Sequence, residues 1–199
     1  MIYIYIIMIK LINFILLYFT IANDIKIFSE TYDQYNNITL PYINRIYKQN
    51  TKWINNIFTL RNNNLILYKN NNLIIVKDRV FIENNLYILA FPLKPIKTIR
   101  DLRNYHIPLL YEMKNKIIYI AQLYNISEDQ LYIYFHYHPS YYYLHLHGSI
   151  ISHPLLDTRY RRHFFIDEII NNLKNDSYYY KYKTLVFELK SNNKLFYLL

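Results

Sequence analysis

The chain is patterned mainly as short apolar runs separated by polar turns. Runs rich in Ile, Leu, Val and Tyr are bounded by Asn clusters, which serve as turns because Asn tolerates left-handed backbone and the chain has only one Gly. These runs predict β-strands at residues 65–68, 73–76, 86–91, 131–136, 143–151 and 183–189. The short connection between the fourth and fifth runs predicts that these two strands pair antiparallel.

Helical spacing of apolar residues is clearest between Pro108 and Leu123, which predicts a long helix with Pro in its first turn. Thr98 and Asp101 have the spacing of a capping box just before it. Further helices are predicted at 26–35, from the candidate N-cap Thr51 onward, and at 159–173, with a linker through Pro41. The pattern as a whole indicates the α+β class, with a mostly antiparallel sheet packed by a long helix.

Residues 1–22 form a hydrophobic segment that needs its own interpretation. A run of this length could span a bilayer or act as a signal peptide. It has no basic region at its start, however, and Lys10 in its middle is costly for a span. We therefore favour a buried strand or helix, or an over-extended gene model, and membrane contact stays open. Residues 23–199 are predicted to form one domain.

The composition excludes some classes of function but does not identify one. An excess of Ile, Asn, Tyr and Lys is typical of an AT-rich genome, so the net charge of +9 carries limited weight alone, although a positive site attracts a polyphosphate substrate. The absence of Cys excludes a disulfide framework and a thiolate zinc site. It also fits a reducing compartment, and we expect a cytoplasmic or nuclear protein.

The groups capable of chemistry are concentrated in one strand. Because side chains alternate between the faces of a strand, Tyr143, His145 and His147 are expected on one face, and Leu144 and Leu146 in the core. Neutral imidazole is a good nucleophile toward phosphorus, and imidazolium is a good acid near neutral pH. The row therefore favours phosphoryl or nucleotidyl transfer.

This strand resembles the signature of the histidine-triad (HIT) superfamily, and most closely that of the scavenger mRNA decapping enzymes. The resemblance runs from about Glu30 to the C-terminus. The motifs that carry it, in order, are Glu30-Thr31, residues 35–41, Trp53, Ile99-Arg100-Asp101-Leu102, Ile107-Pro108-Leu109-Leu110, Pro139-Ser140-Tyr141-Tyr142 and Arg161-Arg162. It implies a HIT-like catalytic domain that hydrolyses the triphosphate bridge of 7-methylguanosine-capped dinucleotides or short capped RNA. A homodimer without metal or cofactor is expected.

The resemblance also implies the roles of individual residues. His145 would attack the phosphate next to 7-methylguanosine, and water would hydrolyse the resulting phosphohistidine to release 7-methyl-GMP. Trp53 would stack on the cationic methylated base, although a core Trp is the alternative, and Asp78 would contact guanine. His147 and His136 are the further residues expected to be catalytic. The residues expected to bind the substrate around the phosphates are Ser140, Tyr141, Arg162 and Tyr143. Ser140 could equally be an ordinary turn residue.

Three residues depart from the family pattern near the site. Tyr143 replaces the first triad histidine, and a phenol cannot carry positive charge at neutral pH, so turnover is expected to be weakened but not necessarily abolished. Gly148 replaces an apolar residue and predicts a bulge or a close backbone approach. His138 would share the face of His136 if the strand continued, but a solvated loop position is favoured.

Base recognition is expected to be degraded, because the guanine-reading glutamate of the family falls near Asn62 or Asn63. Because few residues precede Glu30 here, we expect that the family's N-terminal domain, which closes over the capped substrate, is absent, and this would put size selectivity in doubt. Two alternatives therefore stay open. One is a catalytically weak paralogue that binds cap or nucleotide as a regulator, and the other is a HIT hydrolase of other nucleotides.

Overall fold

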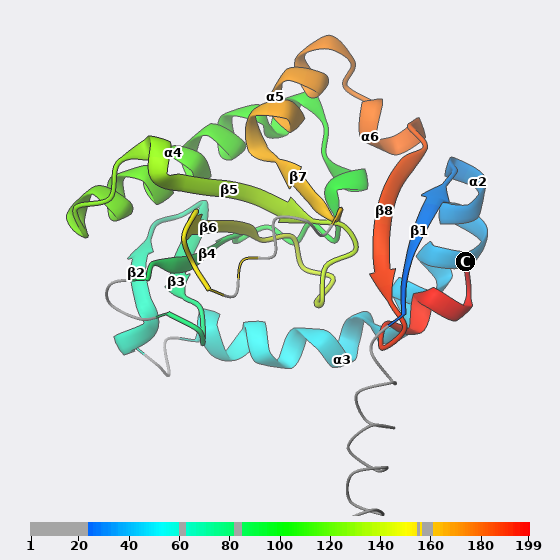
Figure 1. The fold of residues 1–199 in the computed structure, drawn as a ribbon, viewed down its shortest axis with the longest axis horizontal. Helices are drawn as coiled ribbons and strands as arrows, with labels where there is room; N and C mark the ends of the chain where they lie inside the picture. Colours follow the sequence, from blue (N-terminus) through cyan, green and yellow to red (C-terminus); the bar gives the residue numbers. More distant parts are fainter. Residues whose placement is uncertain (1–23, 60–62, 82–84, 155, 157–160) are drawn as a thin grey trace, which may run out of the picture.

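The computed structural model describes most of the chain after the hydrophobic segment. The described residues are 24–59, 63–81, 85–154, 156 and 161–199 (Figure 1). In the helix that ends at Phe58, the side chains of 48–53 and 55–57 are not described either. The predictions for residues 1–22 lie outside the described residues. Within the described ranges, no helix is long and apolar enough to cross a membrane.

A six-stranded antiparallel sheet forms the centre of the fold (Figure 1). Its strands are β2 (Ile66–Lys69), β3 (Leu73–Lys77), β4 (Tyr87–Pro92), β5 (Leu131–His136), β6 (Leu146–Ile150) and β7 (His163–Phe165), in the order β2-β3-β4-β6-β5-β7. The predicted antiparallel pairing of β5 with β6 is confirmed, with Tyr134 opposite His147. The α+β class with a mostly antiparallel sheet is confirmed as well.

A second, two-stranded sheet pairs the start of the described chain with a strand near its end. β1 (Ile25–Glu30) runs antiparallel to β8 (Leu185–Lys190), which places Phe28 opposite Phe187 (Figure 1, blue and red). The helix predicted over 26–35 is therefore wrong for its first half. Phe28 and Glu30 are buried and alternate with exposed residues, so pairing with the distant β8 decides the local structure.

The N-terminal helical segment is longer than its sequence suggests. α2 (Tyr32–Gln34), capped by Thr31, passes through a π-helical turn at Tyr35–Thr39 into α3 (Leu40–Phe58). The predicted linker through Pro41 and the predicted N-cap at Thr51 are both wrong. Pro41 is the second residue of α3, and the first turn of a helix tolerates Pro because the N–H groups there need no partner within the helix.

The remaining helices are α4 (Ile107–Leu123), α5 (Ile166–Asn175) and α6 (Tyr179–Tyr182). α4 confirms the predicted long helix, with Pro108 in its first turn, and the capping box of Thr98 and Asp101 is present before it. The helix predicted over 159–173 is wrong at its start. His163–Phe165 extends along β5 as the edge strand β7, and the helix begins only at Ile166.

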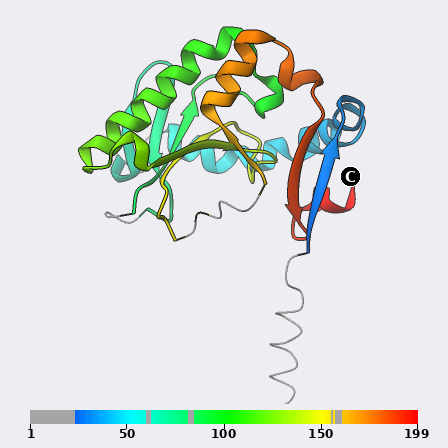
Figure 2. The same ribbon diagram turned by 45° about the horizontal axis from the view of Figure 1, so that its top comes forward.

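The two faces of the large sheet are covered differently. α4 and α5 lie side by side over one face in both views (Figures 1 and 2), and Leu73, Ile75 and Leu146 point into the main core there. On the opposite face, Ile54 of α3 packs in a smaller cluster with neighbours from β3 and β4. The members of that cluster are Ile54, Ile74, Val76, Tyr87, Leu89, Phe91 and Tyr143.

Gly148 marks the close approach of α4 to the sheet. A Cβ atom at this position would lie 2.5 Å from Cγ2 of Ile117. The register is regular on both sides, with Ile88 and Ile133 opposite Gly148, so there is no bulge here. The predicted close approach is confirmed, and the alternative of a bulge is wrong.

A buried ion pair joins β1 to the segment before α4. Nη2 of Arg100 lies 2.8 Å from Oε2 of Glu30, and both side chains are almost fully buried. The guanidinium also donates to the backbone carbonyls of Tyr180 and Lys183, each at 3.1 Å. Glu30 and Arg100, which belong to the motifs of the family resemblance, therefore connect parts of the fold in its interior.

His138 belongs to this buried cluster and not to the solvent. Its Nε2 lies 3.3 Å from Oε1 of Glu30, and the side chain is fully buried. The favoured prediction of a solvated loop histidine is wrong, because β5 ends at His136 and His138 packs against Phe187. Burial raises the pKa of Glu30, but the contacts with His138 and Arg100 outweigh it and hold the pKa at about 2. Because burial also lowers the pKa of His138, we assign the counter-charge at neutral pH to Arg100.

Candidate active site

The candidate site lies on the sheet face opposite α4, where β6, β5 and β7 meet. The predicted alternation is confirmed, since Leu144 and Leu146 point into the main core and Tyr143 into the smaller cluster of the opposite face. The strand itself is shorter than predicted and begins at Leu146. Even so, His145 stacks on Phe91 of β4 with ring centroids 5.2 Å apart, so it lies on the same face as Tyr143.

His145 has a fixed orientation and a free ring nitrogen. Its Nδ1 lies 2.7 Å from the backbone carbonyl of Tyr143. A carbonyl only accepts, so Nδ1 carries the proton and Nε2 carries the lone pair. The side chain is 7% exposed, and burial lowers its pKa to about 4. At neutral pH His145 is therefore a neutral imidazole with an available nucleophilic nitrogen.

His147 lies beside His145, with ring centroids 4.8 Å apart. The hydroxyl of Tyr87 is 3.1 Å from Nδ1 of His147 and 2.8 Å from the hydroxyl of Tyr134. Nε2 is buried and has no hydrogen-bond partner among the described groups. When Tyr87 donates to Nδ1, the His147 proton sits on Nε2, where it is available to a phosphate oxygen. Burial lowers the pKa of His147 well below its ordinary value.

His136 and Arg162 form the third part of the site. Nη2 of Arg162 donates to Nδ1 of His136 at 2.6 Å, and the ring of His136 lies 4.2 Å from that of His147. Burial, and then the neighbouring His147 and the charge of Arg162, lower the pKa of His136 well below its ordinary value. The structure therefore brings His145, His147, His136 and Arg162 together, with one permanent positive charge among neutral imidazoles.

His163 is a further member of this cluster that the sequence analysis missed. It lies opposite His136 in the β5–β7 register, and the two rings stack at 5.0 Å. Its ring is also 4.1 Å from that of Tyr134. It was missed because residues 159–173 were predicted to be helical, and a residue in a helix would not pair with His136 across two strands. A prediction of extended backbone from Arg161 to Phe165 would have placed His163 in a strand.

Tyr143 supports the site through its position and not through a contact of its phenol with His145. Its hydroxyl donates to the carbonyls of Pro92 at 2.9 Å and Leu93 at 3.2 Å. The ring packs edge-on against Phe58 of α3, with centroids 5.5 Å apart. Burial raises the pKa of Tyr143, so the phenol stays neutral at neutral pH.

The other predicted site residues lie around this cluster at different depths. Ser140 is exposed and Tyr141 half-buried in the loop between β5 and β6. Asp78 follows β3, half-buried, and its Oδ1 accepts from the backbone N–H of Val80 at 3.0 Å. Burial is the main cause of the raised pKa of Tyr87, and the charge of Asp78 adds to it.

The predicted base-binding residues are only partly described. Trp53 lies in α3, but its side chain is outside the described part, as is Asn62. Asn63 begins a 3-10 turn before β2. Among the described residues, no group of three or more His, Cys, Asp or Glu is arranged to hold a metal ion.

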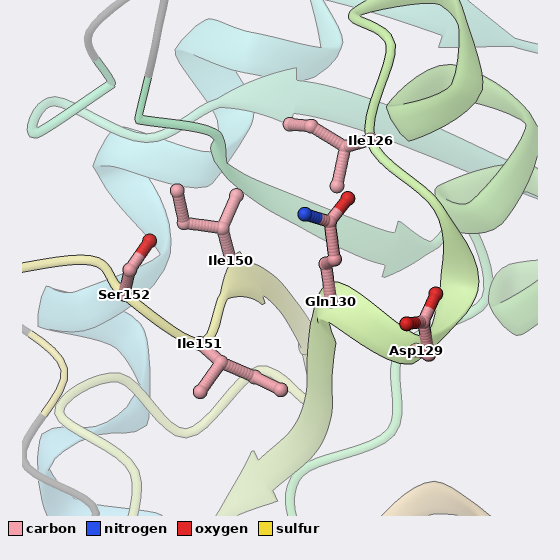
Figure 3. A pocket seen from close by; sticks show the side chains of 6 residues that line it. All are labelled: Ile126, Asp129, Gln130, Ile150, Ile151 and Ser152. Atoms are coloured by element: carbon pink, nitrogen blue, oxygen red, sulfur yellow. The ribbon is translucent and has the colours of Figure 1, made fainter.

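A pocket of about 280 Å³ lies at the opposite end of the β5–β6 pair (Figure 3). It is lined by Ile126, Asp129, Gln130, Ile150, Ile151 and Ser152. Because β5 and β6 are antiparallel, Gln130 and Ile150 lie at the far end of these strands from His136 and Leu146. The pocket is therefore separate from the histidine cluster.

Comparison with known proteins places these residues in a family. A family model described as scavenger mRNA decapping enzyme C-term binding matches residues 52–161. An m7GpppX diphosphatase from Caenorhabditis elegans is 31% identical over 83% of this chain and 56% of its own length. The m7GpppX diphosphatase from Homo sapiens is 30% identical over 90% of this chain and 56% of its own length. That from Ascaris suum is 32% identical, over 85% and 60% respectively.

The chain thus spans between half and two thirds of the length of these curated relatives. Among solved structures, a HIT family hydrolase from Legionella pneumophila Philadelphia 1 is 20% identical, with a TM-score of 0.41 over 47% of this chain and 86% of that chain. The family model covers more than half of the 199 residues, and it includes the segment with His136, His145 and His147. The chain therefore belongs to the scavenger mRNA decapping enzyme family, through the C-terminal domain of these proteins.

Proposed function

We propose that this chain hydrolyses the triphosphate bridge of 7-methylguanosine-capped dinucleotides or short capped RNA fragments, with His145 as the nucleophile. The observation that carries the proposal is the contact of 2.7 Å between Nδ1 of His145 and the carbonyl of Tyr143. It holds the proton on Nδ1 and leaves the lone pair on Nε2, as attack on phosphorus requires. The relatives named m7GpppX diphosphatases support this choice of substrate.

In the first step, Nε2 of His145 attacks the phosphorus next to 7-methylguanosine. The N–P bond forms as the bond to the bridging oxygen breaks, and the nucleoside diphosphate leaves with the electron pair on that oxygen. Arg162, held 2.6 Å from His136, supplies positive charge to the phosphate oxygens. Nε2 of His147, which has no partner among the described groups, donates a hydrogen bond to the same phosphates.

In the second step, water attacks the phosphorus of the phosphohistidine. The new O–P bond forms as the N–P bond breaks, and the electron pair returns to Nε2 of His145. The products are 7-methyl-GMP, the free imidazole and a proton that passes to solvent. Burial keeps the pKa of His145 near 4, so the regenerated imidazole is neutral and ready for the next substrate.

The test is hydrolysis of a methylated cap dinucleotide by the wild-type chain and by His145→Asn, with products separated by ion-exchange chromatography. His145→Asn is expected to abolish hydrolysis, and a 7-methylguanylyl adduct on His145 is expected in wild type at short times by mass spectrometry. His106→Asn is the matched control, because His106 bonds to the backbone of Arg103 away from the site. Substantial hydrolysis by His145→Asn would refute the mechanism.

The two alternatives, a regulator that binds cap without turnover and a hydrolase of other nucleotides, are less favoured because the matched relatives are named for the m7GpppX reaction. A hydrolysis assay with methylated and unmethylated dinucleotides separates the three functions. Hydrolysis of only the methylated form supports cap scavenging, equal rates support the general hydrolase, and hydrolysis of neither form supports the regulator. We also propose a homodimer, which sedimentation analysis of the purified chain tests directly.

A further inference from the structure

An aromatic surface continues from the histidine cluster to the edge of the sheet. We call Tyr132, His163 and Phe165 the edge platform. The ring of Tyr132 lies 4.7 Å from that of Phe165 and 5.8 Å from that of His163. Ring contacts this short between neighbouring strands place these side chains on one face of the sheet, the face that carries His136 and His147.

The edge platform is accessible. β7 is the last strand in the order of the large sheet, so within the described residues no further strand pairs with its outer edge. Phe165 is 40% exposed, and Tyr132 and His163 are half-buried. An exposed aromatic ring beside half-buried ones, at the margin of a reactive site, offers a flat surface on which a planar ligand can stack.

The position of the platform relative to the nucleophile identifies its occupant. The smaller cluster, with Ile54 of α3 and Phe91 of β4, lies on one side of His145. The residues expected to bind the methylated base belong to α3 and the end of β3, and so to the same side. Across the strand order β4-β6-β5-β7, the platform lies on the other side of His145. Arg162, whose Nη2 lies 2.6 Å from Nδ1 of His136, carries the charge that a polyphosphate chain would follow.

We propose that the edge platform is the subsite for the first transcribed nucleoside of the capped substrate. This inference rests on the proposed function and adds to it a binding site for the leaving group. The base of that nucleoside stacks on Phe165 and Tyr132, and His163 lies where the platform meets the phosphate-binding residues. Stacking on aromatic side chains tolerates any base, because every base has a π-face, so the subsite selects for the presence of a second nucleoside and favours the larger purines.

The experiment compares two ligands that differ in the second nucleoside. Binding of a methylated cap dinucleotide and of 7-methyl-GTP, which lacks that nucleoside, is measured by calorimetry on the His145→Asn protein, with and without Phe165→Ala. Phe165→Ala is expected to weaken binding of the dinucleotide about tenfold and to leave binding of 7-methyl-GTP within about twofold. Phe165→Trp, which keeps a stacking surface, is the matched control and is expected to bind both ligands like the parent protein.

The outcomes separate this subsite from the proposed function. If the parent protein binds neither ligand, the proposed function fails and the subsite with it. If the parent binds both ligands equally well, or if Phe165→Ala weakens both by the same factor, the subsite is refuted while cap binding stands. A change of oligomeric state on Phe165→Ala, measured by sedimentation with unchanged dinucleotide binding, would assign the platform to a second copy of the chain and would also refute the subsite.

Discussion

The backbone carbonyl of Tyr143 accepts a hydrogen bond from Nδ1 of His145 at 2.7 Å. Tyr143, which stands where the family resemblance places the first triad histidine, therefore orients the proposed nucleophile through its main chain, a contact that does not depend on the side chain at this position. The phenol has a separate task, since its hydroxyl donates to the carbonyl of Pro92 at the end of β4. Loss of the histidine side chain at position 143 thus leaves the tautomer of His145 unchanged.

Substitution of Tyr143 by Phe and by His separates these two tasks. Tyr143→Phe keeps the ring and the backbone contact but removes the donor to Pro92, so we expect turnover within a few-fold of wild type and a loss of stability of about 1 kcal/mol. Tyr143→His restores an imidazole that can carry charge, and we expect it to raise turnover by about tenfold or more. Steady-state kinetics and urea unfolding of both variants provide the measurement. A rate for Tyr143→His at or below that of wild type would mean that the site has adapted to the phenol.

Trp53→Leu tests recognition of the methylated base. α3, which carries Trp53, packs through Ile54 against β3 and β4 on the site face of the sheet. A cation–π stack in a desolvated pocket is worth about 2 kcal/mol, or about thirtyfold in affinity. Trp53→Leu is therefore expected to weaken binding of 7-methyl-GMP by about that factor and to affect GMP much less, because only the methylated base is cationic. An equal loss for both ligands in a calorimetric titration would assign Trp53 to packing.

Local sequence patterns predicted the elements whose stability is local. α4 was predictable because its Pro108, its capping signal and its apolar spacing all agree, and most strands of the large sheet lie between clear turns. β1 was not predictable in this way, because only its pairing with β8, more than 150 residues away, makes an extended conformation favourable. β7 has three residues, and its extended form depends on the exposed edge of β5.

The candidate site shows the same difference between features that a local sequence pattern predicts and features that depend on pairing between distant segments. The alternation of Tyr143, His145 and His147 was visible in one strand, and Arg162 followed from the family resemblance. His163 was missed because its proximity to His136 is a property of two strands and not of one. The resemblance could not tell that Glu30 and Arg100, 70 positions apart, pair in the interior, away from the proposed nucleophile His145.

The buried ion pair predicts strongly coupled effects on stability. Arg100→Met leaves the carboxylate of Glu30 buried without its counter-charge, and we expect a loss of about 3 to 5 kcal/mol in urea unfolding. Glu30→Gln in the same background removes the unpaired charge, so the double variant is expected to be more stable than Arg100→Met alone. Additive losses in this cycle would contradict an energetically coupled pair.

The close approach at Gly148 predicts a second coupled pair. Gly148→Ala introduces a Cβ within 2.5 Å of Cγ2 of Ile117, which is buried and branched at its Cβ, and we expect a loss of about 1 to 3 kcal/mol. Ile117→Ala alone opens a cavity and costs about 2 to 5 kcal/mol. Because the alanine at 148 partly fills that cavity, the double variant is expected to lose clearly less than the sum. Strict additivity in urea unfolding would refute the contact.

The buried imidazole of His145 predicts how activity and stability depend on pH. Burial lowers its pKa from 6.5 to about 4, so the nucleophile stays neutral well below pH 6.5, and we expect it to impose no acidic fall in kcat/KM until pH approaches about 4. In the unfolded chain the same residue takes up a proton near pH 6.5. The unfolded state therefore binds more protons between pH 6.5 and 4, and the free energy of unfolding falls as pH falls through this window. His145→Asn removes this titration, so between pH 7 and pH 5 it is expected to lose about 2 kcal/mol less stability than wild type in urea unfolding. Parallel losses in the two proteins would show that His145 is not held neutral by burial.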